Sequence, residues 1–178
     1  MNIEIKSVKI KDSKPFISYF QLDENGNHEA EQDYKKGPKC HEDFINKLNA
    51  LAIHYALLTY YLNLGPIKKV ENYDDKSQIL DSFKVGGFHI GGKDEDQGIV
   101  IVGHRILPNG KAQILNSPFY RFNEDDATRY KFMDELQLAL EDCKDEAKLY
   151  ISGEKVYKEP VVPTLFDNIP AEDSQETV

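Results

Sequence analysis

The chain has 178 residues, of which 40% are hydrophobic and 11% aromatic, and its formal net charge at pH 7 is −9. This length and apolar content are enough for one domain with a real core, and they exclude a disordered protein. The negative charge argues against a broad basic surface for duplex DNA, but it leaves room for a local basic groove.

The first part of the chain predicts a strand meander. Residues 2–10 and 15–22 alternate as strands do, and a change of face near Ser7 predicts a bulge there. An Asn-Gly pair at 25–26 predicts a hairpin turn, after which residues 27–34 return as a polar edge strand.

A helix follows, and then a second set of elements. Apolar residues at steps of three and four predict an amphipathic helix from about His41 to Asn63. A second helix is predicted from Asn123, a good N-cap, to Tyr150, with Gly153 ending it. Three strands are predicted between the helices, over residues 79–91, 98–107 and 111–117.

The element order therefore reads βββα-βββα. Two amphipathic helices have to cover an antiparallel sheet, so we expect an α+β fold. Residues 1–157 are predicted to form a single domain, and residues 158–178 a flexible, acidic C-terminal tail. The two halves suggest an internal duplication, but no residue-level repeat supports it, and coincidence is slightly favoured.

His89 and His104 fall on adjacent predicted strands and raise the question of a metal site. A turn centred on residues 94–95 places His89 opposite Val100 and His104 opposite Val85, on one face but roughly 13 Å apart. Two imidazoles at that separation cannot share a zinc ion. We therefore interpret both as sheet-surface histidines and expect no metal.

The glycine pairs at 86–87 and 91–92 do not form a phosphate-binding loop, because no helix follows and no Gly-Lys-Ser/Thr is present. We expect no cofactor, and we interpret these glycines as places where strands bend or another backbone comes close.

The two cysteines, Cys40 and Cys143, are far apart and in no ligand spacing. We interpret them as reduced thiols. Because the chain also shows no signal-peptide core and no membrane-length apolar run, the sequence favours a cytoplasmic protein. Cys143 falls on an apolar stripe, whereas Cys40 precedes a helix whose dipole would lower its pKa. No base is identifiable beside either, and the sequence favours a non-enzymatic protein.

One patch indicates nucleic-acid binding through aromatic side chains interleaved with cations, as in single-strand binders. Its residues are Lys35, Lys36, Phe119, Tyr120, Arg121 and Arg129. The alternative, which we weight more heavily, is that Phe119 and Phe122 pack the helix start onto the core.

Three short stretches carry a family resemblance: HEDFINKLNALA at 41–52, ILNSP at 114–118 and YISGEK at 150–155. They are similar to the His-x-Asp-Phe-x-x-x-Leu-x-x-Leu, Leu-Asn-Thr-Pro and Tyr-x-x-Gly-Glu elements of a family of uncharacterised small proteins of tailed phages and prophages. The resemblance implies a phage setting in a bacterial host, beside replication and recombination genes. It assigns no catalytic residues.

Leu165 and Phe166 stand in a polar, acidic stretch where local structure cannot bury them, so they are predicted to dock on a partner. The pair resembles the end of peptides that bind the bacterial sliding clamp, although Val162 and Pro163 stand where Gln and Leu are usual. It also matches the terminal Leu-Phe of the phage family.

Taken together, these features predict a non-enzymatic phage accessory protein of DNA replication or recombination that binds single-stranded DNA and recruits a partner, such as the sliding clamp, through Leu165 and Phe166. The alternative is a phage-encoded inhibitor, or a sponge for a nucleotide signal, that acts against a host defence system.

Overall fold

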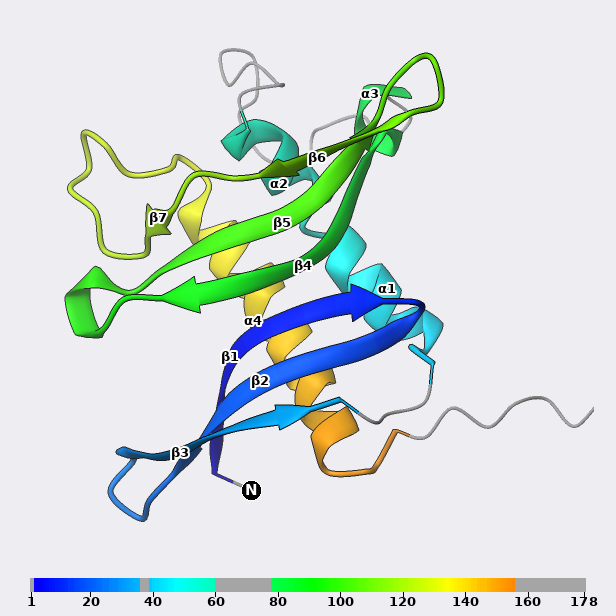
Figure 1. Cartoon of the computed structure of the whole chain (residues 1–178). Helices are drawn as coiled ribbons and strands as arrows, with labels where there is room; N and C mark the ends of the chain where they lie inside the picture. Colours follow the sequence, from blue (N-terminus) through cyan, green and yellow to red (C-terminus); the bar gives the residue numbers. More distant parts are fainter. Residues whose placement is uncertain (1, 36–38, 60–77, 156–178) are drawn as a thin grey trace, which may run out of the picture.

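The computed structural model describes residues 2–35, 39–59 and 78–155. Within them, an antiparallel sheet forms one layer and helices cover one of its faces (Figure 1). The strands are β1 (Ile3–Lys11), β2 (Lys14–Leu22), β3 (His28–Tyr34), β4 (Phe83–Gly91), β5 (Gly98–Ile106), β6 (Ala112–Asn116) and β7 (Tyr120–Arg121). The helices are α1 (Glu42–Asn49), α2 (Ala52–Leu58), α3 (Gln78–Asp81) and α4 (Met133–Ile151). The predicted α+β class is confirmed.

The strand order is β3-β2-β1-β4-β5-β6, with the short β7 beside β5. Each set of three strands is a meander, and the two meanders join where β1 pairs with β4. That junction is short, because the paired residues on β1 run only from Ser7 to Lys9. The predicted order of two βββα sets holds in outline, with α3 and β7 added.

The local features of the first meander are those that the sequence predicts. The register shifts between Ile5 and Ser7, which confirms the bulge. The turn before β3 is closed by Asp23, whose carboxylate accepts the backbone N–H groups of Asn25 and Asn27, each at 2.8 Å. Gly26 takes a φ of 83°, which glycine adopts without strain.

A glycine brings the two meanders together. A Cβ added at Gly87 would lie 2.0 Å from the carbonyl oxygen of Val8, so only glycine lets β1 approach β4 this closely. A second bulge precedes it, since the register shifts between Val85 and Gly87. Both observations confirm that these glycines bend a strand and admit a neighbouring backbone.

The first predicted helix is in fact two helices. α1 ends at Asn49, and the chain turns through Ala50 and Leu51 before α2 begins. The bend lets α1 pack against α4 and β4 while α2 packs against β4, so both helices bury their apolar sides. The last predicted turn, residues 60–63, lies outside the described residues.

The predicted start of the second helix at Asn123 is wrong, because α4 begins at Met133. Tyr130 and Phe132 are both buried, and positions two residues apart lie on opposite sides of a helix. Residues 122–132 form turns and bends before the helix begins. The predicted end is confirmed, with Gly153 at a φ of 76°.

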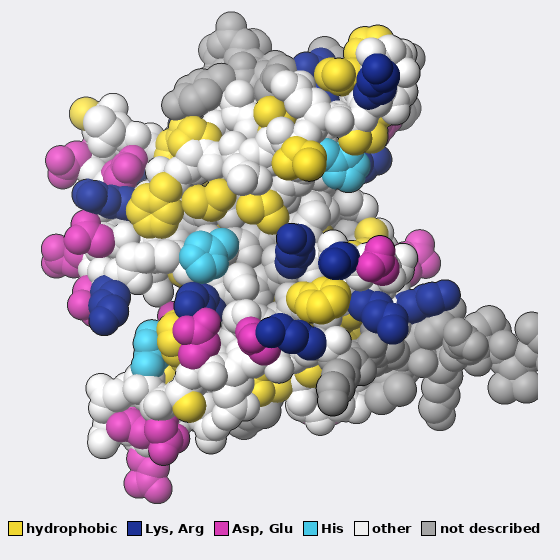
Figure 2. All heavy atoms as spheres, in the orientation of Figure 1, with side chains coloured by type: hydrophobic (Ala, Val, Ile, Leu, Met, Phe, Trp, Pro, Cys, Tyr) yellow, Lys and Arg dark blue, Asp and Glu magenta, His cyan; other side chains and the backbone are white. Residues whose placement is uncertain are grey.

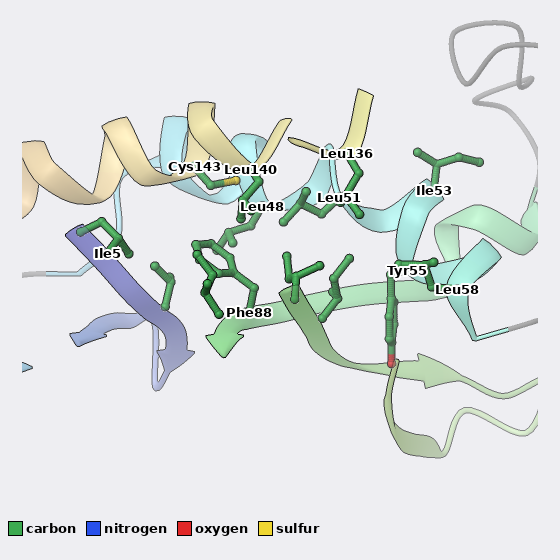
Figure 3. Packing of buried hydrophobic residues seen from close by; sticks show 14 of the residues in the cluster. Ile5, Leu48, Leu51, Ile53, Tyr55, Leu58, Phe88, Leu136, Leu140 and Cys143 are labelled. Carbon is green, nitrogen blue, oxygen red and sulfur yellow. The ribbon is translucent and has the colours of Figure 1, made fainter. Parts of the chain in front are cut away.

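The core lies between the helices and one face of the sheet (Figure 3). Leu48 of α1, Leu51 at the start of α2 and Leu140 of α4 point toward the sheet, where Phe88 lies. Cys143 is fully buried among them, as its place on the apolar stripe predicts.

Candidate binding groove on the open face of the sheet

The face of the sheet that the helices leave uncovered, called the open face below, carries a groove of about 690 Å³ that crosses β1, β4, β5 and β6. Strand alternation decides which side chains reach it. Phe88 and Ile101 are buried on the helix side, so their neighbours His89 and Val102 face outward. Figure 2 shows the open face, with hydrophobic side chains in a row over its middle and acidic ones gathered mainly toward its edges.

The groove follows from the two bulges. β1 and β4 bulge on either side of their short junction, and a bulge bends a strand and increases its twist. The meanders therefore splay apart beside this junction, and the backbone of Gly86 and the side chains of Ser7 and Ile10 line the space between them.

Most of the groove lining is apolar, and the charged or titratable side chains in and beside it are basic. Lys9, His89 and His104 line it, and Lys84 lies directly opposite His104 on the neighbouring strand. Among the described residues, no Asp or Glu lines the groove, and no ion pair involves Lys9 or Lys84. Uncompensated cations beside low-dielectric walls attract anions. In a chain of net charge −9, this makes the open face a candidate site for an anion.

An aromatic side chain lies beside His89, one of the residues that line the groove. Phe119 is 45% exposed and lies across two facing glycines of β4 and β5. A Cβ added at Gly98 would lie 2.7 Å from its ring, and one at Gly91 would lie 3.6 Å from that ring and 3.8 Å from the ring of His89. Phe119 and His89 are therefore neighbours, and the glycines leave room for both rings.

Ser117 holds the turn that presents Phe119. Its side chain is buried, and the hydroxyl oxygen accepts the backbone N–H of Ile101 at 2.9 Å. The hydroxyl donates to the carbonyl of Pro118, also at 2.9 Å. These bonds continue the ladder between β5 and β6 past the last paired residue. They give a structural reason for a hydroxyl residue in the Leu-Asn-Ser-Pro stretch.

Four of the predicted nucleic-acid-binding residues lie near this end of the sheet, where Phe119 lies beside His89 and Arg121 lies opposite Gly98 of β5. Tyr120 is half-buried, with its ring 6.1 Å from that of Tyr130. Arg121 lies 3.4 Å from Asp96, and Arg129 forms an ion pair at 2.5 Å with Asp134. Both arginines are thus partly neutralised.

The predicted lysines are not brought to these residues. Lys35 follows β3 at the far edge of the sheet and pairs with Asp33 at 2.6 Å. β3 is four strands from β5, roughly 19 Å at the usual strand spacing. Lys36 lies outside the described residues. The packing alternative fits Phe122, which is buried, and not Phe119.

Leu165, Phe166 and the whole tail from residue 158 lie outside the described residues. Their role in partner docking stays a prediction from the sequence.

The histidine geometry agrees with the sequence in one position and differs in the other. His89 lies opposite Val100, as predicted. His104 lies opposite Lys84 and not Val85, because the bulge at Gly86 shifts the register by one. Within the described residues, no cluster of three His, Cys, Asp or Glu side chains could hold a metal ion.

Two titratable groups with shifted pKa values, Cys40 and His54, lie away from the groove lining. Burial raises the pKa of Cys40 to about 11, which corrects the expectation of a lowered value from the helix dipole. Burial also lowers the pKa of His54 to about 4, so this imidazole is neutral at pH 7, with Nδ1 3.0 Å from the hydroxyl oxygen of Tyr130. Neither group lines the groove.

The sequence reasoning missed Lys9 and Lys84. Each belongs to a strand whose alternation was visible, but they come from different meanders. Only the pairing of β1 with β4 brings both strands to one groove. The sequence pattern that could have placed Lys84 on the open face is the alternation along the strand, because its neighbour Phe83 is apolar and buried on the other face.

Comparisons with known protein families, curated proteins and solved structures found no match to this chain. Among the described residues, none of the helices has the length and apolarity needed to cross a membrane.

Proposed function

We propose that the protein binds single-stranded DNA on the open face and acts as a non-enzymatic accessory protein of phage DNA replication or recombination. One observation carries the binding proposal: in the part of the chain that the structure describes, the groove has no acidic lining residue, and Lys9 and Lys84 form no ion pair near the exposed ring of Phe119. The phage setting rests on the sequence resemblance alone.

The chemistry of the groove suits a single strand better than a duplex. Single-strand binders combine cations that follow the phosphates with rings on which bases stack, each stacked base contributing roughly 1–3 kcal/mol. In a duplex the bases are already stacked on one another, so Phe119 would find no free base. The net charge of −9 is compatible with this site, because at physiological salt charges beyond about 8 Å are largely screened.

The test is fluorescence anisotropy with short single strands and duplexes over a range of salt concentrations. Removing two phosphate contacts should reduce the slope of log affinity against log salt by about 1.4 for a single strand. The variant Lys9→Ala/Lys84→Ala is expected to show this change. Single-stranded DNA that binds no tighter than duplex, or an unchanged slope, would contradict the proposal.

A matched control removes two lysines elsewhere. Lys144 and Lys148 lie on α4 and pair with Glu141 and Asp145, each at 2.7 Å. The variant Lys144→Ala/Lys148→Ala changes the net charge by the same amount, and it should keep the wild-type salt slope. A lower slope here would mean that only the total charge matters.

A second candidate is a nucleotide-signal sponge or inhibitor directed against a host defence. It is favoured by the groove volume of about 690 Å³, which is typical of small-ligand sites. Cyclic nucleotides belong in the same anisotropy screen as competitors. Tight binding of a cyclic nucleotide that responds little to salt, with no binding of single strands, would replace the first proposal by this one.

We further propose that Leu165 and Phe166 recruit a partner such as the sliding clamp. Burying a Leu and a Phe contributes roughly 1.5–3 kcal/mol each, enough for weak docking. Replacing both with Ala should abolish capture of a purified clamp and leave the melting temperature unchanged. An earlier melting transition with the clamp still captured would show that the pair belongs to the fold.

A further inference from the structure

Carboxylates lie beyond one end of the groove. Past Phe119, the turn between β4 and β5 carries three consecutive exposed carboxylates, Asp94–Asp96, of which Asp96 pairs with Arg121. On the edge strand β3, in contrast, Glu31 pairs with Lys6 at 2.7 Å and Asp33 pairs with Lys35 at 2.6 Å. A DNA strand that continued past Phe119 would bring its phosphates against the carboxylates of the turn.

The other end of the sheet carries several lysines, with one carboxylate, Asp12, in the turn between two of them. β1 and β4 are antiparallel, so Lys11 at the end of β1 and Lys84 at the start of β4 lie at the same end, away from the Asp94–Asp96 turn. Lys14 faces Lys11 across the β1–β2 turn, and both are exposed. A polyanion that leaves the groove past Lys9 toward these lysines therefore avoids the Asp94–Asp96 turn.

Resting on the proposed function, we infer that the groove holds the end of a single DNA strand and not its interior. The terminal base stacks on Phe119 next to His89, and the chain leaves past Lys9 and Lys84. From Gly91 to Lys84 the sheet extends about 20 Å, which accommodates about six stacked nucleotides at 3.4 Å each. Longer strands add no contacts within the described residues.

The experiment compares a linear strand of about 30 nucleotides, well above the site size of common single-strand binders, with the same sequence ligated into a circle. Isothermal titration calorimetry at low salt gives the affinity and the stoichiometry. The linear strand should bind at least about tenfold more tightly than the circle. The circle, which has no end, thus loses about 1.4 kcal/mol of binding free energy. A linear strand of about six nucleotides should match the long one.

Equal affinity for circle and line, with stoichiometry that grows with length, would overturn the strand-end inference and leave single-strand binding intact. No binding of either DNA would overturn both proposals.

A variant separates the carboxylate barrier from other causes. Asp94→Asn/Glu95→Gln/Asp96→Asn removes the three charges, and Asn is tolerated at the positive φ of 49° that Asp94 adopts. The affinities of this variant for the circular and the linear strand should differ by no more than about threefold, so that the preference for a strand with an end is nearly lost. If the tenfold preference for the line persists, the carboxylates do not select strand ends and the inference fails.

Discussion

The two faces of the sheet are built from the same strands and carry opposite chemistry. On the helix side, Ile5, Phe88 and Ile101 are almost fully buried in one apolar cluster. On the open face, their neighbours include Lys84 and His89, for which folding supplies no partner among the described residues. Side chains on the covered face are explained by packing, whereas for those on the open face we propose ligand binding.

The largest expected difference between the two sides concerns stability. Leu51 is fully buried, and Leu51→Ala should lower the free energy of unfolding by roughly 2–5 kcal/mol through lost burial and a cavity. The control is Leu138→Ala on the outer side of α4, where the side chain is 70% exposed and the change should stay within about 0.5 kcal/mol. Urea denaturation measures both. Similar losses in the two variants would show that the buried side has been assigned incorrectly.

Two phenylalanines close in sequence should separate binding from folding. Phe119→Ala removes the exposed ring and should weaken single-strand binding by roughly 1–3 kcal/mol, the value of one stacked base, with little change in stability. Phe122 is 8% exposed, and Phe122→Ala should instead destabilise the fold by roughly 3–5 kcal/mol. Calorimetric melting and anisotropy on both variants give the comparison. Unchanged affinity in Phe119→Ala would remove this ring from the site.

A pH titration examines the covered side through His54. Burial lowers its pKa to about 4 from an ordinary 6.5, so the unfolded chain takes up the proton more readily than the folded one. The associated stability is complete above pH 6.5 and is lost as the pH falls toward 4. Between pH 7 and 5 the loss should be about 2 kcal/mol.

The variant His54→Gln should lack this decrease, whatever its stability at pH 7. Urea denaturation of both proteins at the two pH values provides the measurement. Equal pH dependence in wild type and variant would mean that His54 is not buried as the structure shows.

The elements that the sequence predicts well depend on local patterns. Alternation located the strands, the change of face near Ser7 located the bulge, and the Asn-Gly pair located the hairpin turn. The start of α4 was misplaced because Phe122 and Tyr130 are buried through turns, and their burial depends on tertiary packing that local propensity does not report.

The groove depends on long-range pairing, and for that reason the sequence did not show it. Lys9 and Lys84 are separated in sequence by β2, β3 and the helices α1, α2 and α3, and the pairing of β1 with β4 brings their strands together. Of the predicted aromatic patch, Phe119 lies beside the groove, whereas Lys35 lies at the opposite edge of the sheet. Residue type indicated the chemistry, and topology decided which residues share a site.

Methyl NMR of the protein with a single-stranded oligonucleotide of about 12 nucleotides most directly tests whether the open face is the binding surface. The methyl groups of Val102 and Ile114 lie in the groove, whereas Leu138 is exposed on α4 and Leu51 is buried in the core. We expect the resonances of Val102 and Ile114 to shift on titration and those of Leu138 and Leu51 to stay in place. Shifts centred on Leu138, or no shifts at a concentration that saturates the DNA, would contradict binding at the open face.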